Sequence, residues 1–347
     1  MKKVKWGVIG AGGIADRRTI PGMLLAENAE IVAVMEVTQE FADRLAEKYK
    51  VPYAYDCVEA LLDNPDVEAV YIASPVSEHY TQVKLAALKG KHILLEKPLA
   101  VTSEQGEELV ALCEKQEVLF AAGMMMRFHA YHQKAKEVVF SGIMGDIIIM
   151  RAQLSCWYPD IPGAWRQTKA ISGGGSLMDM GIHCIDLLQF ISGQEVTRVT
   201  AITATRTFNY EVEDTACALL EFKNGAIGFV DTCNNIPDNA VQGRLEVYGT
   251  KGSILTAGTI GQAEGGEFKL TLSDVEDYDA AQNRVQNEGA TVDVTFGNMY
   301  TKEVESFGES ILSDVPVAVP AAEALQVQKI IEKAYRSSAE GRFIAVP

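Results

Sequence analysis

A glycine-rich turn directly behind the first apolar run constrains the fold of this chain more than any other feature. Residues 4–9 (VKWGVI) are mostly apolar, and Gly10-Ala11-Gly12-Gly13-Ile14-Ala15 follows at once. A helical pattern begins behind the turn. Glycines allow a tight strand-to-helix turn, and a small residue such as Ala15 lets the helix pack closely against the strand. The order of strand, glycine-rich turn and helix predicts the first unit of a parallel α/β fold.

The same alternation continues to about residue 125. Short, almost continuous apolar runs are typical of strands that are buried on both faces of a parallel sheet. We expect strands at Val4–Ile9, Ile31–Val34, Ala69–Ala73, His92–Leu95 and Leu119–Ala122. Apolar residues at three- and four-residue spacing predict helices at Gln39–Tyr49, Glu78–Leu88 and Ser103–Glu117. The first part of the chain is therefore predicted to be a doubly wound parallel sheet, a Rossmann fold.

A different pattern begins after Arg127. We expect helices at Tyr131–Phe140, Leu177–Ile191, Met299–Ser310 and Ala321–Ala339, and strands at Ile147–Leu154, Val196–Thr205, Thr215–Phe222, Ala226–Thr232 and Arg244–Tyr248. Successive strands without helices between them indicate an antiparallel or mixed sheet. The 347 residues are enough for two domains. We predict a first domain at residues 1–125 and a second α/β domain at residues 126–347.

The composition excludes several classes of protein. Hydrophobic residues make up 48% of the chain, too many for a disordered protein. The formal charge of -16 would repel a nucleic acid and an anionic membrane surface. No uncharged run approaches the roughly 18 apolar residues of a membrane helix, and the early glycines do not fit a secretory signal. The six cysteines form no CxxC pair, which predicts reduced thiols in the cytoplasm and no zinc knuckle.

The glycine-rich turn is a candidate dinucleotide site. In this context Gly10 permits the turn, Gly12 lets the backbone approach a pyrophosphate, and the N-terminus of the next helix faces the phosphates. Glu36 stands about 20 residues further on, at the end of the second strand, where a carboxylate can accept hydrogen bonds from a ribose diol. This position favours NAD over NADP. The alternatives are a turn that binds nothing and a solvated glutamate.

Lys97 is the first candidate for chemistry. It follows the strand His92–Leu95 in the sequence Glu96-Lys97-Pro98, so it lies at the carboxyl edge of the predicted parallel sheet. Open α/β sheets bind ligands at this edge. An ammonium there can stabilise the negative charge that develops on a substrate oxygen when a hydride leaves the neighbouring carbon. The alternative is a loop lysine that pairs with Glu96.

A second candidate is the apolar helix that follows Gly173–Gly175. Asp179 and His183 stand four residues apart on one helix face, and Asp186 follows one turn later. A carboxylate beside an imidazole orients the ring and suits a general base that takes a hydroxyl proton. Two alternatives stay open, a metal site formed by the three side chains and a core pair without chemistry. No cysteine or second histidine stands at ligand spacing, and we expect no metal.

In this order the motifs resemble the Gfo/Idh/MocA oxidoreductases over essentially the whole chain. The motifs are VIGAGGIA near the start, Ser74-Pro75 with His79, Glu96-Lys97-Pro98, Gly142-Ile143-Met144-Gly145, Trp165-Arg166, GGGSLMDMGIHCIDLL and the tail Ala334–Arg342. The resemblance implies a Rossmann domain followed by an α/β domain with an open sheet that commonly joins subunits. We therefore expect a homodimer or homotetramer formed through the C-terminal sheet.

The resemblance also implies roles for individual residues. It makes Lys97, Asp179 and His183 the catalytic set, with the histidine as acid and base. It gives a cofactor site of Gly10, Gly12, Gly13, Ile14, Glu36, Ser74, Pro75, His79, Glu96 and Lys97. It also implies that the Lys97–Pro98 bond is cis. Two departures matter: Val76 stands where relatives commonly have Asn, and Glu36-Val37 differs from the Ser-Arg of relatives that use NADP.

The family acts mostly on sugars, cyclitols and their glycosides, which sets the functional hypothesis. We expect an NAD-dependent dehydrogenase that exchanges a hydride between a secondary hydroxyl and nicotinamide. A close alternative oxidises C3 of a glycoside so that the aglycone can be eliminated, and a more distant one is a non-catalytic NAD-binding regulator. Asp179 and His183 are expected to face the substrate together with Arg127, Tyr158, Trp165 and Arg166, and His129, Tyr131 and Asp160 are further candidates.

Overall fold

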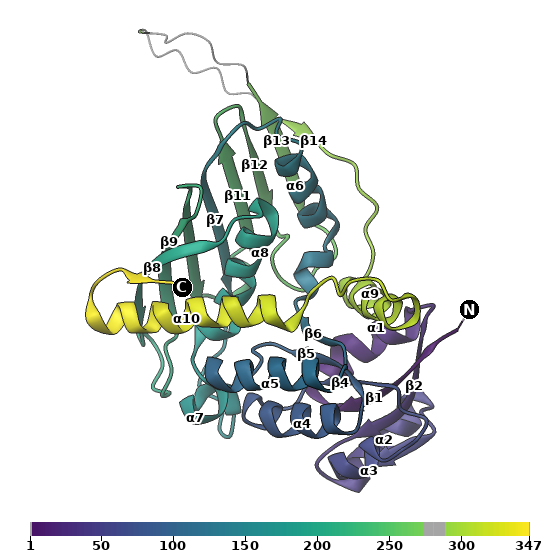
Figure 1. Cartoon of the computed structure of the whole chain (residues 1–347). Helices are drawn as coiled ribbons and strands as arrows, with labels where there is room; N and C mark the ends of the chain where they lie inside the picture. Colours follow the sequence, from purple (N-terminus) through teal and green to yellow (C-terminus); the bar gives the residue numbers. More distant parts are fainter. Residues whose placement is uncertain (1, 274–279, 281–288, 347) are drawn as a thin grey trace. The chain divides into compact units, whose positions relative to one another are not determined.

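The computed structural model describes residues 2–273, 280 and 289–346, which pack as two compact units (Figure 1). The first unit comprises residues up to 128 with 163–174 and 298–329, and the second comprises 129–162, 175–297 and 330 to the end. Each unit is described by itself below. The domain boundary after residue 125 stays a prediction. The packing units differ from it because two later segments, 163–174 and 298–329, belong to the first unit.

The first unit is built on a parallel sheet with the strand order β3-β2-β1-β4-β5-β6. Its strands are β1 (Val4–Ile9), β2 (Ala29–Met35), β3 (Tyr53–Tyr55), β4 (Ala69–Ile72), β5 (His92–Glu96) and β6 (Phe120–Gly123). All five pairings are parallel. From β1 the chain adds β2 and β3 on one side of the sheet, and then β4, β5 and β6 on the other side. The switch point between β1 and β4 is where open α/β sheets bind ligands. The prediction of a doubly wound sheet is confirmed.

Helices cover this sheet. They are α1 (Ile20–Leu25), α2 (Gln39–Tyr49), α3 (Val58–Leu62), α4 (Val76–Leu88), α5 (Ser103–Lys115) and α9 (Met299–Ser313), with the short α7 (Lys169–Ser172) and the turns η1 (Ala15–Thr19), η2 (Met125–Phe128) and η3 (Trp165–Gln167). Thr102 caps α5, because its side chain accepts a hydrogen bond from the backbone N–H of Gln105. Helix α9 comes late in the chain, yet Phe307 packs on Trp6 of β1 with ring centres 5.9 Å apart.

The second unit contains a mixed sheet with the strand order β14-β13-β12-β11-β7-β10-β9-β8-β15. Its strands are β7 (Ile147–Ser155), β8 (Val196–Ala204), β9 (Thr215–Phe222), β10 (Ile227–Cys233), β11 (Arg244–Gly249), β12 (Gly252–Ala257), β13 (Glu267–Leu272), β14 (Ala290–Thr291) and β15 (Ile344–Ala345). Only β7 and β10 pair in parallel among the described strands of this sheet. The expected mainly antiparallel sheet is confirmed.

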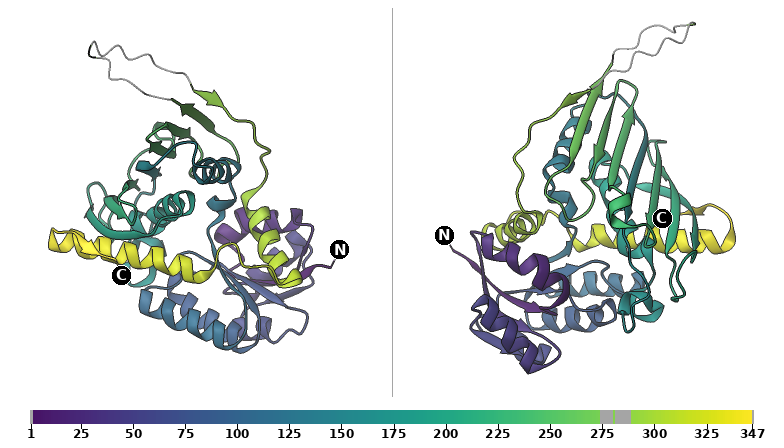
Figure 2. Two further views of the ribbon diagram at one scale, coloured as in Figure 1. Left: turned by 45° about the horizontal axis from the view of Figure 1, so that its top comes forward. Right: turned by 180° about the vertical axis from the view of Figure 1, so that it is seen from behind.

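One face of the mixed sheet is covered by helices (Figure 2). These are α6 (Ala130–Phe140), α8 (Ile182–Ser192) and the second half of α10 (Ala321–Glu340). The turns η4 (Leu177–Gly181) and η5 (Asp238–Ala240) also belong to this unit. Helix α8 is buried along most of its length because its residues are almost all apolar. No described helix of this unit lies on the other face, which exposes Ile202, Leu219, Ile227 and Leu255.

Several details differ from the sequence predictions. The predicted helix Leu177–Ile191 consists of a π-helical turn, η4, followed by the α-helix α8. The strands β3, β12, β13, β14 and β15 and the helix α3 are not apparent in the apolar pattern, because each is short or only partly buried on a sheet edge. Boundaries elsewhere shift by one to three residues, which is ordinary for helix and strand ends.

Candidate active site

The glycine-rich turn passes very close to the end of strand β4. Gly10 has a positive φ of 70°, and a Cβ atom added to it would lie 2.7 Å from the backbone nitrogen of Ser74. The backbone N–H groups of Gly10 and Ala11 both donate to the carbonyl oxygen of Met35, at 3.1 Å. The turn is thus fixed between the ends of β2 and β4, and only glycine fits at its first position.

A cavity of about 380 Å³ opens above this turn. Its lining comes from the ends of β1, β2 and β4, from the helices α3 and α4, and from η3: Gly10, Gly12, Gly13, Met35, Glu36, Val37, Val58, Ala73, Ser74, Pro75, Glu78, Gln82 and Trp165. Most of the residues predicted to bind the cofactor therefore lie together. Trp165, which we expect to face the substrate, also lines this cavity.

Glu36 closes one side of the cavity. Its Oε1 accepts a hydrogen bond from the backbone N–H of Gly12 at 2.7 Å, and its Oε2 accepts one from Val37 at 3.0 Å. A Cβ atom on Gly12 would lie 2.9 Å from Oε1, so glycine is needed for this contact. Each carboxylate oxygen has a second lone pair available. The arrangement fits the adenosine ribose of a dinucleotide, whose two hydroxyls would donate to this carboxylate.

Buried groups behind the cavity hold the turn after β4. The Ser74 hydroxyl donates to Gln82 at 2.6 Å, and the ring of His79 lies between two carbonyl oxygens, that of Pro98 at 2.9 Å and that of Ser74 at 3.0 Å. Burial lowers the pKa of His79 to about 4, although both carbonyl oxygens favour the charged ring. The neutral ring can donate to only one of these two oxygens, and it packs between the Ser74 turn and the loop after β5.

That loop contains Lys97, whose bond to Pro98 is cis, as the resemblance implied. A chain of hydroxyls supports the residue before it. The Thr19 hydroxyl donates to Tyr71 at 2.8 Å, and the Tyr71 hydroxyl donates to the carboxylate of Glu96 at 2.6 Å. Burial raises the pKa of Glu96, while Tyr71 and the charge of Lys97 act in the opposite direction. Sequence reasoning missed Thr19 and Tyr71. The hydroxyl of Tyr71 in the otherwise apolar strand AVYI is the one available signal.

Arg166 also belongs to the first unit. Its guanidinium carbon lies 4.3 Å from the ring centre of Trp165, a cation–π geometry. Its positive charge partly opposes the rise in the pKa of Glu96 that burial causes. Arg166 and Trp165 thus lie with the cofactor cavity and the Lys97 loop, within the same unit.

In the second unit, Asp179 lies on the π-helical turn η4 and His183 in the first turn of α8. His183 is buried, with 5% of its surface exposed. The start of this helix is held by Glu213, whose Oε2 accepts from the N–H of Gly175 and whose Oε1 accepts from that of Leu177, both at 2.9 Å. The Tyr335 hydroxyl donates to the same carboxylate at 2.8 Å. No sequence pattern pointed to Glu213.

Three further predicted substrate residues, Arg127, His129 and Tyr131, contact other side chains or backbone groups of their own unit. Arg127 is buried in the first unit and forms an ion pair with Glu323 at 2.6 Å. His129 is buried at the start of α6, where its Nδ1 accepts from the backbone of Tyr131. The Tyr131 ring stacks on Phe268 at 5.2 Å. Each of these three side chains has a partner inside its own unit, and their contact with a substrate stays a prediction.

Tyr158 and Asp160 lie in the loop after β7. The backbone N–H of Tyr158 donates to Asn234 at 2.7 Å, so this loop continues the pairing of β7 with β10. Asp160 is exposed. Among the described residues no group of three or more His, Cys, Asp or Glu side chains is arranged to hold a metal ion, and none of the helices is long and apolar enough to cross a membrane.

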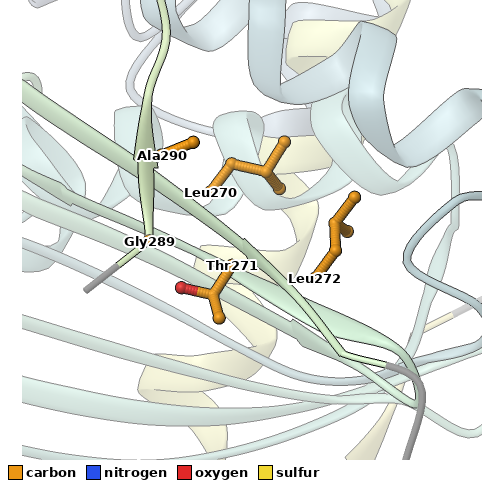
Figure 3. Close-up of a pocket in the computed structure, with 5 residues that line it drawn as sticks. All are labelled: Leu270, Thr271, Leu272, Gly289 and Ala290. Carbon is orange, nitrogen blue, oxygen red and sulfur yellow. The ribbon is translucent and has the colours of Figure 1, made fainter. Parts of the chain in front are cut away.

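A second, shallower cavity lies where β13 meets β14 (Figure 3). It measures about 370 Å³ and is lined by Leu270, Thr271, Leu272, Gly289 and Ala290. Figure 3 shows aliphatic side chains and a single hydroxyl around it. None of the described residues that line it carries a charge.

Comparison with known proteins places this fold and site in a class. A family model described as "Oxidoreductase family, NAD-binding Rossmann fold" matches residues 4–124, and one described as "GFO/IDH/MocA C-terminal domain" matches residues 132–255. The class is thus that of two-domain oxidoreductases with an NAD-binding Rossmann fold. The chain belongs to the Gfo/Idh/MocA family.

Individual relatives differ in what they act on. The chain is 33% identical to trans-1,2-dihydrobenzene-1,2-diol dehydrogenase of Mus musculus over 256 residues, which are 72% of this chain and 73% of the relative. It is 28% identical to D-xylose 1-dehydrogenase (NADP(+)) 2 of Haloferax volcanii over 344 residues, 97% and 98% of the two chains. A crystal structure of aldose-aldose oxidoreductase from Caulobacter crescentus complexed with glycerol superimposes with a TM-score of 0.89 at 27% identity, over 99% of this chain and 100% of that one.

Proposed function

We propose that this protein is an NAD-dependent dehydrogenase that transfers a hydride between a secondary hydroxyl of a sugar, cyclitol or glycoside and nicotinamide. The observation that supports this most is the cavity of the first unit, where the glycine-rich turn and the carboxylate of Glu36 lie together. The relatives, which include a xylose dehydrogenase and an aldose-aldose oxidoreductase, support a polyhydroxylated substrate.

Glu36 supports NAD rather than NADP. A 2'-phosphate would bring negative charge to a carboxylate that already accepts from the Gly12 backbone, and the next residue, Val37, is an exposed apolar side chain with no charge to offer. We propose that Gly10, Gly12, Gly13, Ile14, Glu36, Ser74 and Pro75 contact the cofactor, with Glu96 and Lys97 near its nicotinamide end. We assign His79 a positioning role, because it is buried with both ring nitrogens against carbonyl oxygens.

The bound nicotinamide would supply the hydride acceptor or donor. In oxidation, His183 takes the proton of the reacting hydroxyl at a ring nitrogen, and Asp179 orients the imidazole. The Lys97 ammonium stabilises the oxygen as negative charge develops on it. The support of the Lys97 loop by Tyr71 and Glu96 fits this role, because it holds the backbone from which the ammonium projects. Lys97 belongs to the first unit and His183 to the second, so their contact with one substrate stays a prediction.

Contacts to the rest of the substrate follow from the same residues. We propose that Tyr158 and Arg166 hydrogen-bond substrate hydroxyls, since a phenol and a planar guanidinium suit vicinal diols. Trp165 would cover the cofactor, because it lines the cavity of the glycine-rich turn. Arg127 would act indirectly, through its buried ion pair with Glu323.

The test is a panel of polyols, aldoses and glycosides with NAD⁺, followed by NADH absorbance. His183→Ala should lower kcat by roughly 100- to 10,000-fold, the range of general acid–base catalysis, with the Kd for NAD⁺ unchanged. Lys97→Met should also lower kcat. NAD⁺ binding without turnover on the whole panel would favour the non-catalytic alternative, and an active His183→Ala variant would remove this histidine from the mechanism.

We also propose that the protein forms a homodimer or homotetramer in the cytoplasm. The open face of the mixed sheet presents Ile202, Leu219, Ile227 and Leu255, which lie on one face by strand register. All six cysteines are within the described residues and none forms a disulfide, in keeping with a reducing compartment. Light scattering tests the oligomer: Ile202→Lys with Leu219→Lys should give a monomer, and a monomeric parent protein would contradict the proposal.

A further inference from the structure

Three aromatic side chains form a row in the second unit, with one of them exposed and two half-buried, and the proposed mechanism does not use them. The Trp157 ring meets the Phe208 ring edge to face at 5.3 Å, and Phe208 stacks on Tyr210 at 5.5 Å with the two rings 28° apart. Trp157 is 44% exposed. We call Trp157, Phe208 and Tyr210 the aromatic row. Such a surface suits the apolar face of a ring-shaped ligand.

The aromatic row is held rigidly from behind. The carboxylate of Asp214 accepts the backbone N–H groups of Arg206, Thr207 and Phe208 at 2.8 to 3.0 Å. On the other side, the backbone N–H of Trp157 donates to Asp238 at 2.8 Å. A surface held in this way loses little conformational entropy when a ligand binds, which favours a recognition role.

Tyr210 links the two loops of the row. Its hydroxyl donates to the carbonyl oxygen of Tyr158 at 3.3 Å. Burial raises the pKa of Tyr210 to about 12, with smaller contributions from the charges of Asp214 and Asp160, so the hydroxyl stays protonated and able to donate. The row therefore joins the loop of the predicted substrate residue Tyr158.

The same loop reaches the helix of the predicted catalytic residues. Glu213, next to Asp214, accepts the N–H groups of Gly175 and Leu177 at the start of η4, and its carbonyl oxygen accepts that of Ser176 at 3.0 Å. Asp179 follows within this turn, and its own N–H donates to the carbonyl oxygen of Gly175. The aromatic row and this helix are thus attached to one short segment at one end of the mixed sheet.

Polar side chains beside the row favour a sugar over an aryl group. Asp160 lies near Tyr210, and Asn209 stands between Phe208 and Tyr210 with its side chain exposed. Carboxylates and amides form hydrogen bonds with the hydroxyl groups of a sugar, whereas an unsubstituted aryl ring offers them no hydrogen-bond partner. We propose that the aromatic row binds the second ring of a two-ring glycoside whose first ring is oxidised at His183. This inference rests on the proposed function and extends it to the length of the substrate.

The test compares one-ring and two-ring substrates. Cellobiose and maltose provide the second sugar ring, phenyl β-D-glucopyranoside provides an aryl group, and methyl β-D-glucopyranoside provides neither. Trp157→Ala and Phe208→Ala should each raise KM for a disaccharide about five- to tenfold, with kcat and the KM for the methyl glucoside within twofold of the parent. Phe140→Ala is the matched control, because Phe140 is an exposed aromatic residue of the same unit, outside the row.

Saturation-transfer NMR with cellobiose and maltose gives a readout that does not depend on turnover. Saturation should reach the second ring in the parent protein and fall in Trp157→Ala. An absence of transfer to either disaccharide, or equal KM changes for one- and two-ring substrates, would overturn the inference. An effect on the phenyl glucoside alone would also overturn it and indicate an aryl site. Binding at the row without any NADH formation would instead contradict the proposed function and leave the row as a sugar site.

Discussion

Two glycine-rich turns have similar local sequences and different surroundings: one lies within the first unit, and the other lies where the chain passes from the first unit to the second, between Gly174 and Gly175. Each precedes a π-helical turn and an α-helix: Gly10–Gly13 leads into η1 and α1, and Gly173–Gly175 leads into η4 and α8. The first turn lines a cavity of about 380 Å³. The second is closed by Glu213, whose carboxylate and carbonyl oxygens accept three successive N–H groups, those of Gly175, Ser176 and Leu177.

The difference shows what decides whether a helix N-terminus is available to a ligand. Unsatisfied N–H groups and the helix dipole make such an end attractive to anions, wherever it occurs. In the second unit the protein supplies its own anion, and a Cβ atom on Gly175 would lie 2.0 Å from the carbonyl oxygen of Glu213. Glycine is needed there for internal packing. In the first unit Glu36 accepts the N–H of Gly12 and the carbonyl oxygen of Met35 accepts those of Gly10 and Ala11, yet Gly10, Gly12 and Gly13 still line the cavity.

The largest effect is expected from Gly10→Ala. The added methyl group would clash with the backbone nitrogen of Ser74, and the positive φ costs an L-residue about 1–2 kcal/mol. We expect the Kd for NAD⁺ to rise at least about 100-fold by calorimetry. Gly90→Ala is the control, because Gly90 also has a positive φ, of 68°, but nothing lies within 4 Å of its Cβ position. Similar NAD⁺ affinities for the two variants would show that the first turn has no special role.

The next largest effect is a dependence of protein stability on pH, which we expect from the buried ring of His79 behind the first turn. His79 has a pKa of about 4 in the folded protein and about 6.5 when unfolded, so its contribution to stability is complete above pH 6.5 and is lost as the pH falls toward 4. Between pH 6.5 and 4.5 the loss amounts to about 2–3 kcal/mol. Urea unfolding should show that His79→Asn loses less stability over this range than the parent protein. Equal losses would mean that the ring is not buried and neutral.

A crossed pair of variants compares the two carboxylates directly. Glu213→Gln should cost about 2 kcal/mol of unfolding free energy, because charged acceptors at a buried helix end are worth more than amides, and it should leave the Kd for NAD⁺ unchanged. Glu36→Gln should raise that Kd about tenfold with a stability loss below about 1 kcal/mol. Thermal unfolding and calorimetry measure both. Loss of cofactor affinity in Glu213→Gln would contradict the contrast between the turns.

The smallest effect concerns Trp165, which lines the cavity of the first turn. Excitation of tryptophan should transfer energy to bound NADH in the parent protein. Trp165→Phe should lower this signal, with Trp6 of strand β1 supplying part of what remains, while the Kd for NADH changes less than about threefold, because the aromatic face is kept. Trp157→Phe serves as the control and should retain the transfer. If Trp157→Phe lost the signal instead, NADH would be bound by the second unit.

The fold was largely predictable because buried parallel strands leave strong signals. Strand β1 and helix α2 have the bounds that the apolar pattern predicted, Val4–Ile9 and Gln39–Tyr49. The short edge strand β3 was missed because half-buried residues on a sheet edge give no continuous apolar run. The addition of 298–329 to the first unit was also missed. Phe307 packs on Trp6, and such distant pairs cannot be read from local periodicity.

The site was predictable where a motif fixes the backbone. Gly10, Gly12 and Glu36 lie around one cavity, as the spacing indicated. Residues that act through tertiary hydrogen bonds were missed: Tyr71 joins Thr19 to Glu96 across two strands, and Glu213 closes a helix that precedes it by many residues. Trp165 lies on the cofactor cavity because its segment packs with the first unit, and nothing in its own sequence reveals this.

Hydrogen–deuterium exchange of the full chain, with and without NAD⁺, compares the two turns most directly. Peptides that cover residues 10–16 should gain protection when NAD⁺ is added. The amides of Gly175 and Leu177 should already be protected without it, because Glu213 accepts them. New protection confined to residues 173–179, with none at residues 10–16, would contradict the assignment of the cofactor to the first turn.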